Sequence, residues 1–198
     1  MYPHIKRLFD LLLVLLTAPL WLPLMAVLAV LVKVTSPGAV FFKQKRYGKN
    51  HRFFMIYKFR SMYASAPKDV PTHLLQNPAA LITPVGRLLR KSSLDELPQL
   101  FNILKGDLSL VGPRPALWNQ DDLIAAREKY GANSVPAGLT GLAQVSGRDE
   151  LPIEEKAAYD GEYVKRMGFF FDLYILLRTV FGVFSARGVS EGGPVSKK

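Results

Sequence analysis

The chain of 198 residues contains no cysteine, which excludes disulfide bonds, a thiolate nucleophile and cysteine-ligated zinc. It has only three histidines, His4, His51 and His73, and their positions give no HExxH or related spacing of metal ligands. A GxxxxGKS/T phosphate loop and a GxGxxG dinucleotide fingerprint are also absent. The sequence therefore gives no support to the common zinc enzymes or to the common nucleotide-binding folds.

Acidic residues are scarce near the start of the chain, and the formal net charge of the whole protein is +10. Residues 1–60 contain ten lysines and arginines against the single acid Asp10, a net charge of +9, whereas the other 138 residues have sixteen against fifteen. Such a basic region predicts contact with anionic lipid, nucleic acid or a phosphorylated substrate. We expect Asp10 to pair with Lys6 or Arg7, one helical turn earlier.

A long uncharged run follows this basic start. Leu11–Val32 holds twenty-two residues without a charge, about 33 Å of helix and enough to cross a bilayer. Hydropathy alone therefore favours a simple transmembrane anchor. However, Pro19 and Pro23 interrupt the helix and leave arms shorter than half of the ~30 Å hydrocarbon layer. Both flanks are basic, which places both on the cytoplasmic side. These observations favour a re-entrant helix that bends at the prolines.

The remaining pattern predicts an α+β fold that is mostly helical. Two β-rich runs around residues 47–50 predict a small hairpin rich in cations. The last helical pattern, residues 169–184, is either a core-facing helix or an amphipathic helix in the lipid interface. The other helical patterns cover residues 81–90, 94–104, 123–130 and 153–167. We expect three segments, namely a re-entrant membrane helix with basic flanks at 1–35, a domain at the cytoplasmic face at 36–188 and a flexible tail at 189–198.

Two adjacent carboxylates stand where basic residues gather. The stretch from Lys91 to Pro115 reads KSSLDELPQLFNILKGDLSLVGPRP and places Asp95 and Glu96 at the start of a helical pattern. One interpretation is structural, because Ser93 and Glu96 fit the S-x-x-E capping box. The other is catalytic, because helix N–H groups and nearby cations would keep Asp95 ionised, without a raised pKa, as a carboxylate nucleophile. The local pattern leaves both interpretations open.

Basic side chains on either side of the two acids fit the handling of phosphate. Arg87, Arg90 and Lys91 precede Asp95 by four to eight residues. Arg114 stands between two prolines, which restrict its backbone and suit a guanidinium that is aimed at a phosphate group. A glutamate next to the nucleophile could hold Mg²⁺, which neutralises diphosphate charge. Together these residues predict chemistry on a phosphorylated substrate.

Several motifs in a fixed order give the chain a resemblance to a known family. They are KRLFD ahead of the proline-interrupted helix, then SPGAVFFKQKRYG, YKFRSM, SSLDELPQLFNILKGDLSLVGPRP, PAGLTGLAQVSGR and EYVKR, and they extend from about Lys6 to Gly188. In this order they resemble the small monotopic phosphoglycosyl transferases of the bacterial sugar-transferase superfamily. The block from LDELPQ to GPRP is highly specific, whereas the hydrophobic helix alone is not.

The resemblance implies a re-entrant membrane helix and an active site at the cytoplasmic face of the bacterial inner membrane. It implies transfer of a phospho-sugar from a UDP-sugar to polyprenol phosphate, usually undecaprenyl phosphate, with Mg²⁺ as cofactor and release of UMP. By the same resemblance Asp95 is the nucleophile that carries a covalent phospho-sugar, Glu96 is the assisting or metal-linked carboxylate, and both are candidate metal ligands. The implied phosphate, nucleotide or other substrate contacts are Lys58, Arg60, Arg90, Arg114, Gln144, Arg148 and Asp160.

One position departs from the pattern of this family. Its members often carry Ser-Pro at the helix break, whereas this chain has Leu22-Pro23 and so lacks a hydroxyl there. Thr17 and the additional Pro19 are the residues that could compensate.

Two other classes of function compete with the transferase. One is a membrane-anchored basic module that binds nucleic acid, for which the interleaved cations and aromatic residues of the hairpin are typical. The other is a structural anchor without catalysis. The nucleic-acid module leaves the adjacent acids and the GPRP turn without a purpose. We therefore expect a UDP-sugar, polyprenol phosphate and the bilayer as partners, and no nucleic acid.

Overall fold

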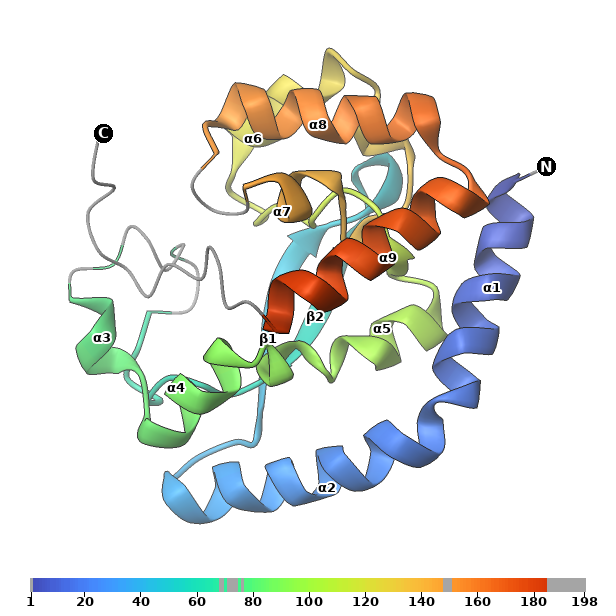
Figure 1. Ribbon diagram of the computed structural model, residues 1–198. Helices are drawn as coiled ribbons and strands as arrows, with labels where there is room; N and C mark the ends of the chain where they lie inside the picture. Colours follow the sequence, from blue (N-terminus) through green and yellow to red (C-terminus); the bar gives the residue numbers. More distant parts are fainter. Residues whose placement is uncertain (1, 68–69, 71–74, 76, 148–150, 185–198) are drawn as a thin grey trace.

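The computed structural model describes residues 2–67, 70, 75, 77–147 and 151–184 of the chain. Helices predominate in this part, with two small sheets (Figure 1), so the predicted class, a mostly helical α+β fold with a small hairpin, is confirmed. The elements are α1 (Tyr2–Leu16), α2 (Ala18–Thr35), β1 (Phe41–Tyr47), η1 (Lys49–His51), β2 (Phe53–Phe59), α3 (Pro78–Leu81), α4 (Pro84–Lys91), η3 (Leu94–Glu96), α5 (Gln99–Lys105), β3 (Ser109–Val111), α6 (Asp121–Glu128), η4 (Ala132–Ser134), β4 (Gly138–Thr140), α7 (Leu142–Ser146), α8 (Ile153–Arg166) and α9 (Phe169–Phe184).

The first two helices border the rest of the molecule. In the view of Figure 1, α1 runs along one side and α2 along the base, so that the two form an L. Helices α5 and α9 lie inside this L, and α6 and α8 lie at the end opposite α2. The tail at 189–198 lies outside the described residues.

The break between α1 and α2 falls at Thr17, and the prediction of a bend at both prolines is wrong in part. The Thr17 hydroxyl donates to the Leu13 carbonyl at 2.7 Å, and the same carbonyl accepts a backbone hydrogen bond from Thr17 N at 3.1 Å. Pro19 lies in the first turn of α2, where no N–H is needed. Pro23 lies inside α2, which continues through it to Thr35. Thr17 and Pro19 thus set the break, and Pro23 does not.

Helix α2 presents two different faces. It buries Trp21, Met25, Leu28 and Val32 against the rest of the molecule. The Trp21 indole donates to the Val14 carbonyl at 3.0 Å, which links α2 to α1 across the break. Its other face exposes Leu20, Leu22, Leu24, Val27, Val30, Leu31 and Val34. Among the described residues, α2 is the one helix that is long and apolar enough to cross a membrane.

Buried polar contacts hold α1 against the domain. The Lys6 ammonium is 2.6 Å from the Asp172 carboxylate of α9, and the Ser109 hydroxyl donates to Asp10 at 2.6 Å. Arg7 donates to the carbonyls of Ile103 and Leu104, where α5 ends. The predicted pairing of Asp10 with Lys6 or Arg7 is therefore wrong, because each of the three side chains reaches a partner about 100 or more residues away.

The predicted hairpin is confirmed. Strands β1 and β2 pair antiparallel from Phe41↔Phe59 to Tyr47↔Phe53, and Asn50 in the turn has a left-handed backbone with φ of 52°. The Asn102 amide of α5 accepts a hydrogen bond from Tyr57 N at 3.0 Å and donates to Met55 O at 2.8 Å. These two bonds fasten α5 along β2. The second sheet is a short parallel pair, β3 and β4.

Prolines change the boundaries of two of the predicted helices. The pattern over residues 81–90 is divided into α3 and α4, and Pro84 begins the second of these. The pattern over 94–104 becomes the short turn η3 followed by α5, with Pro98 at the N-cap. Gly106 ends α5 at φ of +91°, as the sequence predicts for a helix stop.

Helix α9 buries its aspartate and exposes most of its large apolar side chains. Asp172 and Ile175 are 1% and 0% exposed. The apolar side chains at helical spacing are exposed instead, with Phe170 at 82% and Phe181 at 71%. An ordinary core-facing helix is therefore excluded, and the amphipathic alternative fits the exposed face, which is formed by Phe170, Leu173, Tyr174, Leu177, Val180 and Phe181.

Candidate active site

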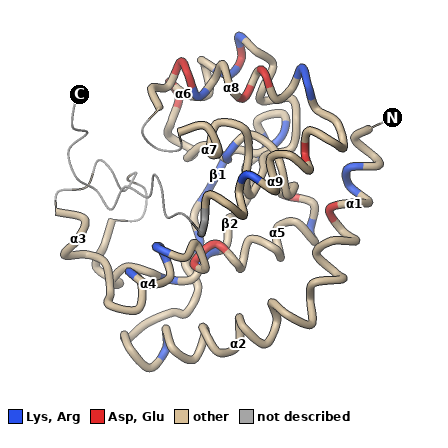
Figure 2. The backbone as a smooth tube through the Cα atoms, viewed as in Figure 1, with Lys and Arg blue, Asp and Glu red and all other residues tan. Residues whose placement is uncertain are grey.

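A cavity of about 1020 Å³ opens at the centre of the domain. Its walls come from the hairpin, α4, η3, the turn after β3, and helices α7, α8 and α9. Figure 2 shows the acidic pair as a red segment between α4 and α5, with basic positions nearby on α4 and on the hairpin. Most of the residues predicted for the site line this cavity, namely Lys58, Arg60, Arg90, Asp95, Glu96, Arg114 and Gln144.

The two carboxylates project from the turn η3, and the capping-box interpretation is wrong. Ser93 has a left-handed backbone with φ of 57°, and its side chain makes no capping hydrogen bond. The Glu96 side chain is committed elsewhere, to Lys58 and Arg114. Because α5 begins only at Gln99, both acids lie in a tight turn ahead of the helix rather than within it. The turn directs two consecutive side chains toward the cavity.

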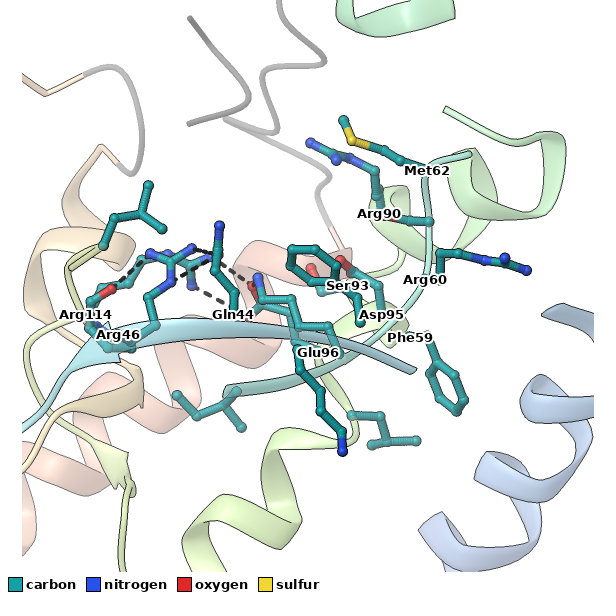
Figure 3. A pocket seen from close by; sticks show the side chains of 18 of the residues that line it. Gln44, Arg46, Phe59, Arg60, Met62, Arg90, Ser93, Asp95, Glu96 and Arg114 are labelled. Atoms are coloured by element: carbon teal, nitrogen blue, oxygen red, sulfur yellow. Dashed lines mark hydrogen bonds and ion pairs between the residues drawn. The ribbon is translucent and has the colours of Figure 1, made fainter. Parts of the chain in front are cut away.

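Glu96 joins three segments of the chain. Its Oε1 atom is 2.7 Å from the Lys58 ammonium of β2. The same atom is 2.6 Å from Nη2 of Arg114, and Figure 3 labels both Glu96 and Arg114. Burial raises the pKa of Glu96, but the charges and hydrogen bonds of Arg114 and Lys58 outweigh burial and hold the pKa well below its usual range. Glu96 is therefore an ionised carboxylate that fixes two cations at the cavity wall.

Asp95 has the opposite surroundings, although it is the next residue. Within the described part of the chain, no hydrogen bond and no ion pair within 4.0 Å engages its carboxylate. Burial, and then the charge of Glu96, raise the pKa of Asp95 to about 6 against the attraction of Lys58, Arg90 and Arg114. The expectation of an unshifted pKa is therefore wrong. Even so, a carboxyl group with a pKa near 6 is about nine-tenths ionised at pH 7.

Backbone contacts fix the turn that carries Arg114. Gly112 N donates to Thr140 O at 2.8 Å, and Gly138 N donates to Pro113 O at 2.9 Å. A Cβ at Gly112 would lie 2.4 Å from Pro136 O, so only glycine allows the two chains to approach this closely. The glycines of GPRP and PAGLTG thus fix the backbone of the turn that carries Arg114.

Sequence reasoning missed a second support of this turn, Gln44 and Arg46. Nη1 of Arg46 donates to Pro115 O at 3.0 Å, while its Nε and Nη2 atoms donate to the Gln44 amide oxygen at 3.1 and 2.6 Å (Figure 3). Arg46 therefore ties β1 to the residue directly after Arg114. The signal that could have revealed the pair is their spacing of two, which places both side chains on one face of a strand.

The other predicted site residues have more varied surroundings. Arg60 donates to Ser36 O at 2.7 Å and also to Pro37 O, so it ties the chain just after α2 to the edge of the cavity. Asp160 does not line the cavity, and it is paired at 2.6 Å with Arg127, which does. Gln144 lines the cavity with an amide that no described residue engages in a hydrogen bond. Arg148 lies outside the described residues.

The donor set for a metal ion is small. No group of three or more His, Asp or Glu side chains that could hold a metal occurs among the described residues. Mg²⁺ is commonly bound by one or two carboxylates, with water and substrate phosphate as the other ligands. Asp95 and Glu96 provide such a pair on the cavity wall, so the residues present fit a magnesium ion that a diphosphate helps to hold.

Comparison with known proteins identifies the class to which this fold and site belong. The chain belongs to the bacterial sugar transferase family, whose model matches residues 1–186. The match includes the two long N-terminal helices, the hairpin, both acids and the GPRP turn.

Individual relatives are similar along nearly the whole chain. The uncharacterized sugar transferase EpsL of Bacillus subtilis is 42% identical over 97% of this chain and 93% of its own length. The exopolysaccharide production protein ExoY of Sinorhizobium fredii is 36% identical over 92% of this chain and 87% of its own. The UDP-glucose:undecaprenyl-phosphate glucose-1-phosphate transferase of Caulobacter vibrioides is 41% identical over 88% of this chain and 68% of its own.

Proposed function

We propose that this protein transfers a phospho-sugar from a UDP-sugar to polyprenol phosphate, and so forms a polyprenyl-diphosphate sugar and UMP. The observation that carries the proposal is the pair of adjacent carboxylates on the wall of one cavity, of which one is held by two cations and the other has no partner within the described part of the chain. Family membership supports the reaction type, because a relative at 41% identity is named for the transfer of glucose 1-phosphate from UDP-glucose to undecaprenyl phosphate.

The reaction proceeds in two displacements at the same phosphorus. An oxygen of the Asp95 carboxylate attacks the phosphorus that carries the sugar, the bond to the bridging oxygen breaks, and UMP leaves with the electron pair. The phosphate oxygen of polyprenol phosphate then attacks the aspartyl-bound phosphorus and releases the Asp95 carboxylate. Asp95 suits this role because no hydrogen-bond donor occupies its oxygens in the described part of the chain.

The cations around Asp95 offset the negative charge that meets there. Arg90 and Arg114 line the same cavity, and Glu96 keeps Arg114 and Lys58 in fixed positions. Preorganised donors of this kind stabilise developing phosphate charge without reorganisation during the reaction. A magnesium ion at Asp95 and Glu96 would supply further neutralisation of the diphosphate when bound.

The N-terminal segment supports placement at one face of the bacterial inner membrane, with residues 1–35 as a re-entrant helix and residues 36–188 as a cytoplasmic-face domain. The same domain holds both ends of the segment. Lys6 near the start of α1 pairs with Asp172, and Arg60 of the domain binds the carbonyl of Ser36 after α2. A segment that crosses the membrane has its ends on opposite sides, where one domain cannot hold both.

The proposed reaction is tested with purified protein in lipid nanodiscs. We expect UMP release from a panel of UDP-sugars only when polyprenol phosphate is present in multiple-turnover assays, and a mass increase of one phospho-sugar on Asp95 when donor is given alone. Release that persists in the variant Asp95→Asn would contradict the proposed nucleophile. Salt-sensitive nucleic-acid binding without UMP release would favour the basic-module alternative.

The topology is tested by thiol labelling, for which the chain is convenient because it has no cysteine of its own. His4→Cys and Lys33→Cys each introduce a single thiol at an exposed position on either side of the helix break. A membrane-impermeant maleimide should label both positions from the same side in oriented vesicles. Labelling from opposite sides would establish a spanning anchor instead.

A further inference from the structure

One group on the cavity wall has no use in the reaction steps above. The Oε1 and Nε2 atoms of Gln144 are both buried, and neither has a hydrogen-bond partner among the described residues. An unpaired buried amide is unfavourable, and most buried polar groups in proteins are paired. Because Gln144 lines the cavity, a ligand is the natural partner for both atoms.

The position of Gln144 relates it to the phosphate-binding turn. A Cβ at Gly141 would lie 2.1 Å from Gly112 O and 2.8 Å from the Gln144 Oε1 atom. The amide therefore lies beside the backbone two residues ahead of Arg114. A nucleotide that places its diphosphate at Arg114 can extend its nucleoside toward Gln144, and a cavity of about 1020 Å³ has room for it.

The surroundings of Gln144 distinguish a nucleobase from a sugar. Three apolar residues, Leu139, Ala143 and Leu176, line the same cavity from β4, α7 and α9, and Ala143 precedes Gln144 directly on α7. The hydroxyls of Thr140 and Thr179 bond to each other at 2.7 Å, and Arg127 uses its Nε and Nη2 atoms on Asp160. A hexose has several hydroxyls that each need partners, and among the described residues these contacts already occupy the two threonine hydroxyls and two nitrogen atoms of Arg127. A flat ring with a single polar edge fits this part of the cavity better.

We propose that Gln144 recognises the uracil ring of the donor nucleotide. The amide oxygen accepts a hydrogen bond from the N3–H group of uracil, and the amide nitrogen donates to the adjacent ring carbonyl. The two atoms of Gln144 that are unpaired in the protein alone are thereby both satisfied. This inference rests on the proposed function, since that function makes the donor a UDP-sugar, and it assigns the base-specificity of the same site.

The test compares UMP with N3-methyl-UMP by titration calorimetry on the full-length protein in nanodiscs. The methyl group removes the N3–H donor and leaves both ring carbonyls. We expect the wild-type protein to bind UMP about tenfold more tightly than N3-methyl-UMP. In Gln144→Met, which keeps the side-chain volume, the two nucleotides should bind with affinities within about twofold of each other. Thermal unfolding checks that the variant folds, and Ser146→Ala, an exposed change on the same helix, is the matched control.

Three outcomes would overturn the inference. The wild-type protein could show no preference for UMP, or Gln144→Met could keep the full preference. Alternatively, Gln144→Met could leave UMP binding unchanged while it raises the KM for the UDP-sugar, which would assign the amide to the sugar. Failure of the proposed function is a separate result, namely no UMP release by the wild-type protein from any UDP-sugar with polyprenol phosphate. Nucleotide binding can also be measured in Asp95→Asn, which lacks the proposed nucleophile but retains Gln144. The binding result is then independent of turnover.

Discussion

Two aspartates of this protein have opposite surroundings, although both lie near cations. Asp172, in the contact between α1 and α9, is 1% exposed and accepts hydrogen bonds from Tyr2 at 2.5 Å, Lys6 at 2.6 Å and Tyr163 at 2.8 Å. Asp95, on the cavity wall, has no such donor in the described part of the chain. One carboxylate is saturated by its neighbours and the other is left open.

The difference separates a structural carboxylate from a reactive one. Three donors hold the Asp172 oxygens, so this side chain fastens the N-terminal helix to the domain and has no lone pair directed at a substrate. At Asp95 the neighbouring Glu96 takes the cations instead, with Oε1 bound to both Lys58 and Arg114. Because Lys58 and Arg114 are bound to Glu96, they do not form ion pairs with Asp95. The Asp95 oxygens are therefore available to attack phosphorus.

The largest expected effect is on catalysis. Asp95→Asn removes the nucleophile, and we expect UMP release to fall by at least about 1000-fold, because Glu96, the other carboxylate among the described lining residues, is bound to Lys58 and Arg114. The measurement is multiple-turnover UMP release at pH 7.5, with Asp121→Asn as the control, since Asp121 is an exposed aspartate of α6. A loss smaller than about tenfold would show that Asp95 is not the attacking group.

The reverse pattern is expected at Asp172. Asp172→Asn leaves the ammonium of Lys6, which is 4% exposed, without its counter-charge, and breaking one side of a buried ion pair destabilises a protein by about 3–5 kcal/mol. We expect a large fall in Tm in detergent or nanodiscs. The double variant with Lys6→Met should recover part of it, because the unpaired charge is then absent.

A matched control for Asp172 lies on the surface. The ion pair of Arg166 with Glu162 is 2.6 Å long, but its side chains are 58% and 45% exposed. Glu162→Gln should therefore change stability by no more than about 0.5 kcal/mol. If Asp172→Asn lowered the stability no more than Glu162→Gln does, the inference that Asp172 holds α1 against the domain would be wrong.

A smaller effect on catalysis is expected when Glu96, which binds Lys58 and Arg114, is changed. Glu96→Gln removes the charge that fixes Lys58 and Arg114, and we expect kcat to fall by about 10- to 100-fold. It also removes a charge that raises the pKa of Asp95 and frees two cations that lower it. In the wild-type protein, kcat should fall as the pH drops below about 6, where Asp95 becomes protonated. In Glu96→Gln this acid limb should move to lower pH, and a shift to higher pH would contradict the assignment.

Local signals in the sequence predicted much of the fold. Alternating β-rich runs gave the hairpin, and Gly106 gave the end of α5. The acids and Arg114 were found because an unusual motif gathers opposite charges within one short stretch. Pro23 was assigned wrongly because a proline disrupts a helix only where its missing bond and its ring cannot be accommodated, and α2 accommodates it.

The remainder depends on contacts that no local pattern contains. Lys6 pairs with a residue 166 positions away, and Ser109 reaches Asp10 across 99 positions. The pKa of Asp95 could not be predicted either, since burial is its largest cause and burial is known only once the chain is folded. Charge in the sequence predicts which residues can interact. The fold decides which of these side chains are paired with each other and which are accessible to a ligand.

The smallest expected effect concerns the dependence of stability on pH. Folding raises the pKa of Asp95 to about 6 from the ordinary range near 4, so the fold favours the neutral carboxyl group. The corresponding contribution to the free energy of unfolding is fully present below about pH 4 and is lost as the pH rises through about 6. In Asp95→Asn the side chain is neutral at every pH, so this contribution to the free energy of unfolding is not lost as the pH rises. The Tm of this variant minus that of the wild-type protein should therefore increase between about pH 4 and pH 6 and stay constant above. A difference that decreases over this interval would mean that the fold stabilises the ionised form, and Asp95 would then resemble Asp172.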